Sequence, residues 1–257
     1  MDDLNDDIAR WKWNVTHTVE FKVETTWSRV NNLARLYFQI AEAAFLDLKN
    51  EEQNPIPVPG FDEDPADHHR QEKRVIAAAI KATVFSAMAC EAGIYDLAAI
   101  QLGDKYATKV LDRLDVIGKW LVVPRLICGK SLDPDGPAIN GLRSLVPARN
   151  KLVHPKSLPG FTDPSDEKQL QAVIDEGNEQ MSQIISAAAP AVQAVILLSL
   201  ELNRVMGTPT GALPFFERDV YSIDERPVGC PMNDLILQCR QIDAKAARKD
   251  VQKKHGT

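Results

Sequence analysis

The sequence predicts a mainly α-helical protein, a bundle of about five helices with a small β-strand accessory near the N-terminus. Two observations predict the helices. Apolar residues recur every three or four positions along most of the chain, as on one face of an amphipathic helix. Prolines and glycines gather between these stretches, where they would interrupt a helix. A third observation predicts the strand, because residues 11–23 alternate between apolar and polar side chains.

The composition is typical of a folded chain and excludes several classes of protein. With 44% hydrophobic and 26% charged residues, the 257 residues can bury a core of their own. A net charge of −6 argues against a histone-like wrapper or a polybasic membrane binder, which need a surplus of lysine and arginine. The N-terminus is acidic where a signal peptide would be basic.

The cysteines and the apolar segments indicate a cytoplasmic protein. No CxxC pair occurs among the four widely spaced cysteines, which indicates neither a disulfide framework nor a zinc site: Cys90, Cys128, Cys230 and Cys239. The most apolar window, residues 184–200, is interrupted by Ser186, Pro190 and Gln193. We expect this window to form a buried helix rather than a membrane span, and we expect no membrane partner.

The alternating segment 11–23 needs a partner, because a single strand leaves its hydrogen-bonding edges open. Residues 219–224 are the candidate within the chain, and the same strand of a second copy is the alternative. We expect three parts: an acidic segment with the strand at 1–24, a helical domain at 25–206, and an irregular segment with a basic C-terminal helix at 207–257.

The first predicted helix follows the strand and carries an apolar stripe from Trp27 to Leu48. It ends before Asn50, and we expect a long loop over residues 51–70 because this acidic stretch contains four prolines. A second long helix is predicted from about Gln71 to Leu102.

The third predicted helix runs from residue 106 to 121 and stops near Pro124. Residues 131–136 have the composition of a turn. The fourth helix covers residues 139–153 and stops at His154, because a residue that precedes proline is pushed out of the α region.

The fifth predicted helix runs from about Asp166 to Met206, with a kink expected at Pro190. Residues 207–231 are expected to be irregular, and a last amphipathic helix begins near Met232. Six basic residues in the segment 240–257 could contact RNA, although a solvated helix end is the more ordinary interpretation.

The end of the fourth helix, residues 147–156, has the sequence PARNKLVHPK and combines features of a catalytic site. Asn150 and His154 are four residues apart and lie on the same helix face. Arg149 follows Leu145 by four residues, which places a cation in line with the apolar stripe. A cation there needs an anion, either an internal carboxylate or the phosphate of a ligand.

Basic residues surround this motif. No acidic residue occurs from residue 136 to 162, whereas Arg143, Lys151 and Lys156 all lie within this range. A local basic window in an acidic chain could bind a phosphodiester, so we expect these three side chains to contact RNA.

The second helix offers an acid as a counterpart. Glu91 follows Ala87 by four residues and therefore lies on an apolar face, with Tyr95 one turn further along. If the second and fourth helices pack together, we expect Glu91 to pair with Arg149.

The pattern Arg149-Asn150-x-x-x-His154 resembles the R-polar-xxx-H signature (Rx4–6H) of the HEPN superfamily, the higher eukaryotes and prokaryotes nucleotide-binding domains. The surrounding order is also similar: an acid-bearing helix at 85–99 (FSAMACEAGIYDLAA), then residues 111–130, then LRSLVPARNKLVHPK at 142–156. The likeness covers about residues 75–156. Pro147 departs from the pattern because it removes an amide donor two residues before Arg149.

This resemblance implies a helical domain that forms a homodimer and brings two copies of the motif into one cleft. Many members are metal-independent endoribonucleases of toxin–antitoxin or antiviral systems, and others only bind RNA or a nucleotidyltransferase partner. Carried over, His154 would be the acid/base at the ribose 2′-OH or the leaving oxygen, Arg149 would hold the phosphate, and Asn150 would orient it. Glu91 and Tyr95 would have supporting roles, and an antitoxin is a further expected partner.

The chemistry is consistent with these roles. Attack by the 2′-OH needs a proton acceptor near neutral pH and a cation beside the phosphoryl oxygens, which histidine and arginine supply without a metal or cofactor. His68 and His69 lie beside Asp64 and Asp67, but we expect them to be solvated rather than to bind a metal.

Two alternatives stay open. The chain is a non-catalytic HEPN-like module if Arg149 serves as a structural anchor and the domain binds RNA or a protein partner. It is a plain helical scaffold if the motif is a coincidence, in which case its basic residues only satisfy the last carbonyls of a helix.

Overall fold

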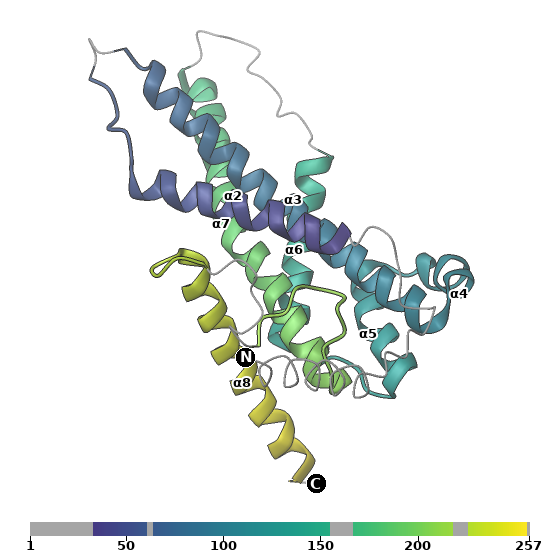
Figure 1. Cartoon of the computed structure of the whole chain (residues 1–257). Helices are drawn as coiled ribbons and strands as arrows, with labels where there is room; N and C mark the ends of the chain where they lie inside the picture. Colours follow the sequence, from purple (N-terminus) through teal and green to yellow (C-terminus); the bar gives the residue numbers. More distant parts are fainter. Residues whose placement is uncertain (1–32, 61–63, 155–166, 218–225, 256–257) are drawn as a thin grey trace, which may run out of the picture. The chain divides into compact units, whose positions relative to one another are not determined.

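The computed structural model describes residues 33–60, 64–154, 167–217 and 226–255 (Figure 1). The chain divides into two units, residues 1–31 and 32–257, and every described residue belongs to the second. The predicted strand at 11–23 and its candidate partner at 219–224 lie outside the described residues. Both therefore stay predictions.

The described ranges are mainly helical, which confirms the predicted α-helical character, and they contain no strand. The elements are α2 (Leu33–Gln53), α3 (Ala66–Leu102), α4 (Asp104–Lys109), the 3₁₀ helix η1 (Leu111–Arg113), α5 (Val116–Cys128), α6 (Pro137–Val153), α7 (Glu167–Met206) and α8 (Pro231–His255).

Helix α3 is the centre of the packing, with contacts to α2, α5, α6 and α7. Alanines line much of the buried surface of α3 and α7, and their small side chains let the helix backbones approach closely. Larger side chains fill the remaining space, among them Phe38, Ile94 and Trp120, which are all nearly inaccessible to solvent. The Trp120 indole donates a hydrogen bond of 3.3 Å to the Cys90 carbonyl and joins α5 to α3.

The predicted end of the first helix and the predicted start of the second are both wrong by a few residues. Helix α2 continues to Gln53, because residues 50–53 contain no proline or glycine that would stop it. Helix α3 begins at Ala66 rather than Gln71, so His68 and His69 lie in its first turn and not in a loop.

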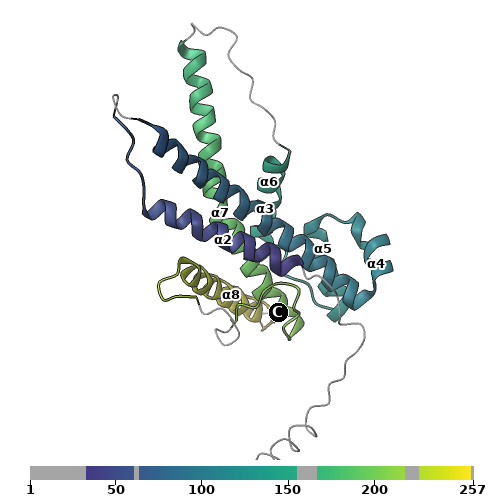
Figure 2. The ribbon, with the colours of Figure 1, turned by 45° about the horizontal axis from the view of Figure 1, so that its top comes forward.

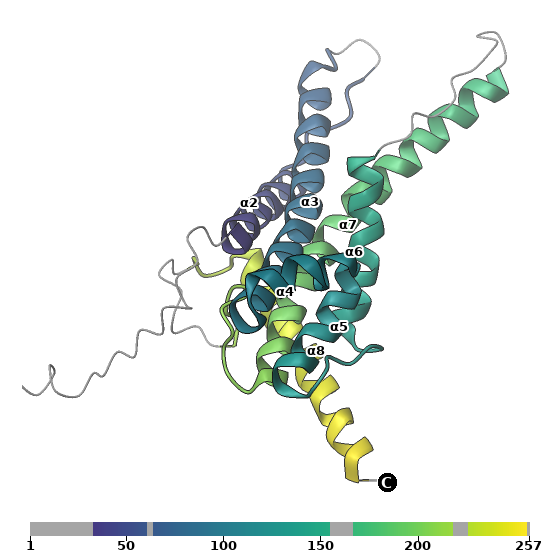
Figure 3. The same cartoon turned by 90° about the vertical axis from the view of Figure 1, so that its right-hand side faces the viewer.

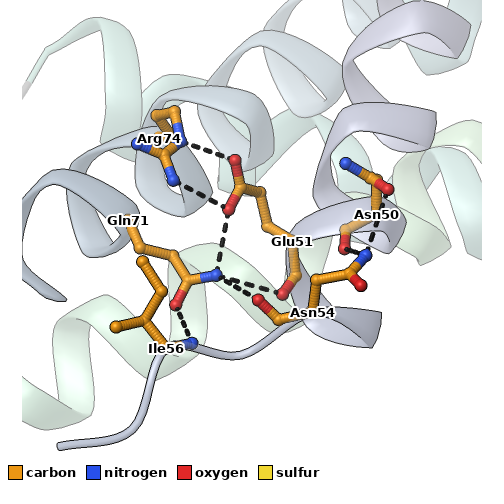
Figure 4. Close-up of polar contacts among 6 residues, drawn as sticks. All are labelled: Asn50, Glu51, Asn54, Ile56, Gln71 and Arg74. Atoms are coloured by element: carbon orange, nitrogen blue, oxygen red, sulfur yellow. Dashed lines mark hydrogen bonds and ion pairs between the residues drawn. The ribbon is translucent and has the colours of Figure 1, made fainter. Parts of the chain in front are cut away.

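A polar cluster holds these two helix ends together (Figure 4). The buried Gln71 amide donates to the carbonyl of Asn54 at 2.8 Å and to a Glu51 carboxylate oxygen at 3.0 Å, and its oxygen accepts from the Ile56 N–H at 2.6 Å. Arg74 also donates to Glu51, at 2.5 and 3.2 Å. Hydrogen bonds from Arg74 and then Gln71 lower the pKa of Glu51 below its usual value.

The predicted helix over 106–121 is wrong, because the structure divides this segment into α4, η1 and α5. The Asp115 carboxylate caps the new helix by accepting from the Gly118 N–H at 2.6 Å. Helix α5 then passes through Pro124, where we expected it to stop, and ends at Gly129, whose φ of 76° only glycine adopts readily.

The later helices agree with the sequence pattern. Helices α6 and α7 have the predicted extents, with Pro147 and Pro190 inside them, and α8 begins at Pro231. Between α7 and α8, residues 207–217 form a strap that is tied to α7: Asn203 donates to Glu217 at 2.6 Å and accepts from the Thr210 N–H at 3.0 Å.

Glycine lets the strap lie directly against α3. A Cβ atom placed on Gly93 would be 2.6 Å from the backbone oxygen of Ala212, closer than real Cβ atoms approach a carbonyl. The hydroxyl of Ser199 donates to the Pro214 carbonyl at 2.6 Å and fixes the strap from the α7 side.

Two described helices, α3 and α7, are long and apolar enough to cross a membrane by length and composition alone. The window 184–200 lies within α7 and is largely buried, as expected. We expected this window to fall short of a membrane span, but α7 passes the test in spite of Ser186, Pro190 and Gln193. The most apolar windows of the two helices are 44% and 56% buried inside the protein, as in the core helices of soluble proteins, so the test is weak evidence for a membrane.

Candidate functional site

The last two turns of α6 present the motif. Leu142 and Leu145 on this helix are buried, and they hold α6 against α3 and α7. Arg149 continues the same stripe, so its side chain extends along the packed face while Asn150 and His154 are exposed. Pro147 lies inside the helix and does not end it.

Arg149 lies beside the acid that the sequence predicted for it. A guanidinium nitrogen of Arg149 is 3.9 Å from a carboxylate oxygen of Glu91 on α3, the outer limit of an ion pair. The side chains are 26% and 42% exposed, so solvent screens this pair and it leaves the guanidinium within reach of a ligand.

The remaining donors of Arg149 are only partly used. Its Nη1 donates to the Asn150 side-chain oxygen at 3.1 Å. Its Nε is buried and has no hydrogen-bond partner among the described residues. An unpaired donor on a buried guanidinium nitrogen costs free energy.

His154 forms the C-terminal cap of α6 and is exposed. Its backbone N–H donates to the Asn150 carbonyl at 3.0 Å, which completes the last helical turn. Arg149 and His154 are five residues apart on the helix, so their side chains leave it in directions about 140° apart. The structure therefore brings Arg149 together with Glu91 and Asn150, and it does not bring Arg149 together with His154 within one chain.

The three predicted RNA-contacting residues differ in their surroundings. Arg143 donates to the Pro134 carbonyl at 2.6 Å and to the Asn140 side chain at 3.0 Å, so it also holds the 131–136 turn against α6. Lys151 is exposed at the motif. Lys156 lies outside the described residues.

Tyr95 of α3 contacts the neighbouring helix α4. Its hydroxyl is 3.0 Å from the Thr108 hydroxyl and joins α3 to α4, which indicates a structural role. A groove of about 220 Å³ lies on the other side of the motif, between α6 and α7. Lys151, Gln180 and Gln183 supply polar groups to it, and Pro147, Leu152 and Ile184 supply apolar ones.

The two adjacent histidines have protein partners. His68 lies 3.3 Å from the Ile56 carbonyl and 3.5 Å from Glu72, and His69 lies 3.1 Å from Glu72. Within the described ranges, no group of three or more His, Cys, Asp or Glu side chains is arranged to hold a metal ion.

Sequence reasoning missed one ionisable residue in the core. Glu201 on α7 is 2% exposed and accepts from the Asp133 N–H at 2.7 Å. Burial raises the pKa of Glu201 to about 7, against the opposing effect of the hydrogen bond from Asp133 and of Arg204. The signal in the sequence is an acid at the end of the apolar run 191–200, and it is far from the motif in the chain.

Comparison of the chain with protein-family models, with curated proteins and with solved structures gave no match.

Proposed function

We propose that the chain is a metal-independent endoribonuclease of the HEPN type, which cleaves RNA by attack of the ribose 2′-OH on the adjacent phosphate. The observation that carries the proposal is the end of α6, where the partly exposed side chain of Arg149, with an unpaired Nε, lies five residues before the exposed imidazole of His154. A cation for the phosphate and a base for the 2′-OH are the two groups that the reaction needs.

In this proposal, His154 accepts the proton of the 2′-OH or donates one to the leaving 5′ oxygen. Arg149 binds the non-bridging phosphoryl oxygens and stabilises the charge that builds on them. Asn150, which already accepts from Arg149, holds the guanidinium in place. Because Arg149 and His154 of one chain diverge, the site is completed in a homodimer, where the imidazole of one copy meets the guanidinium of the other.

We place this nuclease in the cytoplasm, where it would act in bacterial defence or as the toxin of a toxin–antitoxin pair. An antitoxin or a nucleotidyltransferase would then be the protein partner. These assignments rest on the resemblance of the motif and its surrounding helices alone.

A second candidate is a non-catalytic HEPN-like module that binds RNA or a protein. The pairing of Arg149 with Glu91 favours it, because a carboxylate 3.9 Å away competes with a phosphate for the guanidinium. The net charge of −6 also limits non-specific affinity for RNA.

The deciding experiment is RNA cleavage by the purified chain in excess EDTA. We expect cleavage that leaves 2′,3′-cyclic phosphate ends, and we expect Arg149→Ala and His154→Ala each to lower the rate by about 10² to 10⁴. Arg143→Ala is the matched control, because it removes a guanidinium from the same helix and should change binding more than turnover.

Glu91→Gln tests whether Glu91 competes with a phosphate for Arg149. It keeps the size of the side chain and removes the charge that competes for Arg149, so a nuclease should bind RNA more tightly. Absence of cleavage by a folded wild-type dimer would reject the nuclease and leave the binding module.

A further inference from the structure

The first half of α7 is exposed along most of its length. Figures 2 and 3 show it running away from α3 and α6, and nearly all of its residues from 167 to 183 are exposed. In proteins most helical stability comes from packing of an apolar face against another element. An arm of this length with an apolar face therefore needs something to pack against.

The arm carries such a face, with the spacing of a coiled coil. Apolar or small residues follow one another at alternating steps of four and three residues: Leu170, Ile174, Gly177, Met181 and Ile184. The same spacing continues through Ala188, Ala191 and Val195, which are buried in the bundle. Leu170, Ile174 and Met181 are 38%, 45% and 39% exposed, so the seam of the arm is open to a partner helix.

Beyond the first turn of the arm, where Glu167 occupies a seam position and Lys168 an outer one, the charges lie on the face opposite the seam. Asp175, Glu176 and Glu179 occupy the outer positions of the heptad, which point away from a helix packed on the seam. The positions that flank the seam are uncharged: Gln171, Val173, Asn178 and Gln180. Two copies of this acidic chain can therefore meet along the seam without bringing like charges together.

We infer that the first half of α7 is a dimerisation arm, which binds the same segment of a second copy of this chain in antiparallel orientation. Each bundle lies at the C-terminal end of its arm, so parallel arms 8–10 Å apart would force the two bundles into the same space. The antiparallel orientation places the bundles at opposite ends.

Large and small residues are complementary in this orientation. In an antiparallel pair, each residue at the first core position of the heptad faces a residue at the second core position of the partner helix. In this register, Ile174 lies opposite Ile184 of the partner subunit, and Met181 lies opposite Gly177 of the partner subunit. Among the described residues, a Cβ atom on Gly177 would meet nothing within 4 Å, although glycine is less favourable than alanine in a helix interior. Space for the partner's Met181 gives the glycine a function.

A groove at the base of the arm receives the tip of the other arm. It has a volume of about 620 Å³ and lies between α2 and α7, with Leu48, Met181 and Ile185 among its apolar walls. The register brings Leu170 of the partner subunit to this groove. The two charged residues on the wall, Lys49 and Glu52, pair with each other at 2.6 Å and present no net charge to the acidic arm.

The oligomeric state tests this inference, and the inference does not require that the protein cleave RNA. Light scattering during size-exclusion chromatography should give a dimer for the wild type. Ile174→Glu should weaken the dimer at least 100-fold, because it places a charge in the seam. Ala172→Glu adds the same charge two residues away on the outer face and should leave the dimer intact. Circular dichroism should show that both variants keep the helical fold.

Crosslinking tests the orientation. In one chain, Cα atoms ten residues apart on a helix are about 15 Å apart, too far for a disulfide. The double variant Ile174→Cys, Ile184→Cys should therefore form covalent dimers on oxidation, whereas Ile174→Cys alone should not. The wild type with its four native cysteines is the control.

Three results would contradict the inference that the arm forms an antiparallel dimer: a monomeric wild type at about 100 μM, a dimer that survives Ile174→Glu, or crosslinking by Ile174→Cys alone. A monomer with the arm amides protected from hydrogen exchange would mean that the chain covers its own arm. The cleavage assay in EDTA measures nuclease activity independently of the oligomeric state. The two assays together therefore distinguish a nuclease that does not dimerise through the arm from an arm dimer that has no nuclease activity.

Discussion

Glu201 is an acid in a place where an unpaired charge is costly. Its side chain is buried near the end of α7, with the Asp133 N–H at 2.7 Å and Arg204 at 4.0 Å as its partners. Arg204 also binds Asp243 of α8 at 3.1 Å, so the guanidinium is shared between two carboxylates. Burial is the largest effect on Glu201, and the protonated form is favoured at acidic pH.

Glu201 should make the stability of the fold depend on pH. Its folded pKa of about 7 lies above the ordinary value of 4.5, so its favourable contribution is complete below pH 4.5 and is lost as the pH rises through 7. The loss should be on the order of 3 kcal/mol in the free energy of unfolding. Urea denaturation between pH 5 and pH 8 measures it.

Glu201→Gln is the control for this dependence. The amide oxygen of glutamine still accepts from Asp133, and it cannot ionise, so the variant should be more stable than the wild type at pH 8. An equal dependence on pH in the variant and the wild type would show that another group is responsible.

At the level of residues, the sequence predicted one contact and missed another for physical reasons. Arg149 and Glu91 each lie on an apolar stripe, and a buried charge needs an opposite charge, so their pairing could be predicted. The partner of Glu201 is a backbone N–H 68 residues away, at a turn whose position depends on the packing of α5 and α6. No local pattern encodes such a contact.

The largest errors in the predicted helix boundaries occur at helix caps and at prolines. The apolar period through residues 106–121 continues across the break between η1 and α5, so periodicity predicts one helix. Asp115 ends this continuity because its carboxylate satisfies the first free N–H groups of α5. Pro124 lies inside α5, where the surrounding packing of Trp120 and Val123 compensates for the missing hydrogen bond.

A pair of aspartates in this segment tests the importance of the cap. Asp115→Ala should lower the free energy of unfolding by about 1 kcal/mol, because it removes the cap of α5. Asp112→Ala removes only a surface ion pair with Lys119 and should cost less than about 0.5 kcal/mol. Thermal or urea denaturation measures both, and Asp115→Ser should restore most of the stability.

An equal loss in the two alanine variants would contradict the role of Asp115. It would mean that charge in this segment, and not the cap hydrogen bond, determines where α5 begins.

At the level of the whole molecule, charge limits how RNA can bind. The chain has a net charge of −6, and the expected basic contacts lie on α6 and in the residues after it. Four of them, Arg143, Arg149, Lys151 and Lys156, could each neutralise one phosphate.

RNA binding should therefore depend on salt to a modest degree. With four phosphate contacts, the logarithm of the binding constant should fall with the logarithm of the salt concentration with a slope of about −3. Arg143→Ala should reduce the slope by about 0.7. Fluorescence anisotropy of a short labelled RNA measures both, and a slope near zero would exclude binding through this surface.

The class of the fold could be predicted because the helical period and the helix breakers are local properties of the sequence. The extents of α6, α7 and the start of α8 followed from them closely. The arrangement of the helices did not follow, because it depends on contacts such as Arg226 to Glu42, which join residues far apart in the chain. The predicted catalytic residues share one helix, so their separation there could be foreseen, and in the proposed nuclease their assembly into a site would depend on a second chain.

The close approach of the strap to Gly93 also has an evolutionary consequence. Any side chain at this position would collide with the Ala212 carbonyl, so no other amino acid can be substituted while the strap stays in place. In homologues that keep the strap, position 93 should be glycine even where its neighbours on α3 have diverged. A homologue with another residue there should have lost the strap or moved it, and this one position would then report how the segment between the last two helices has changed.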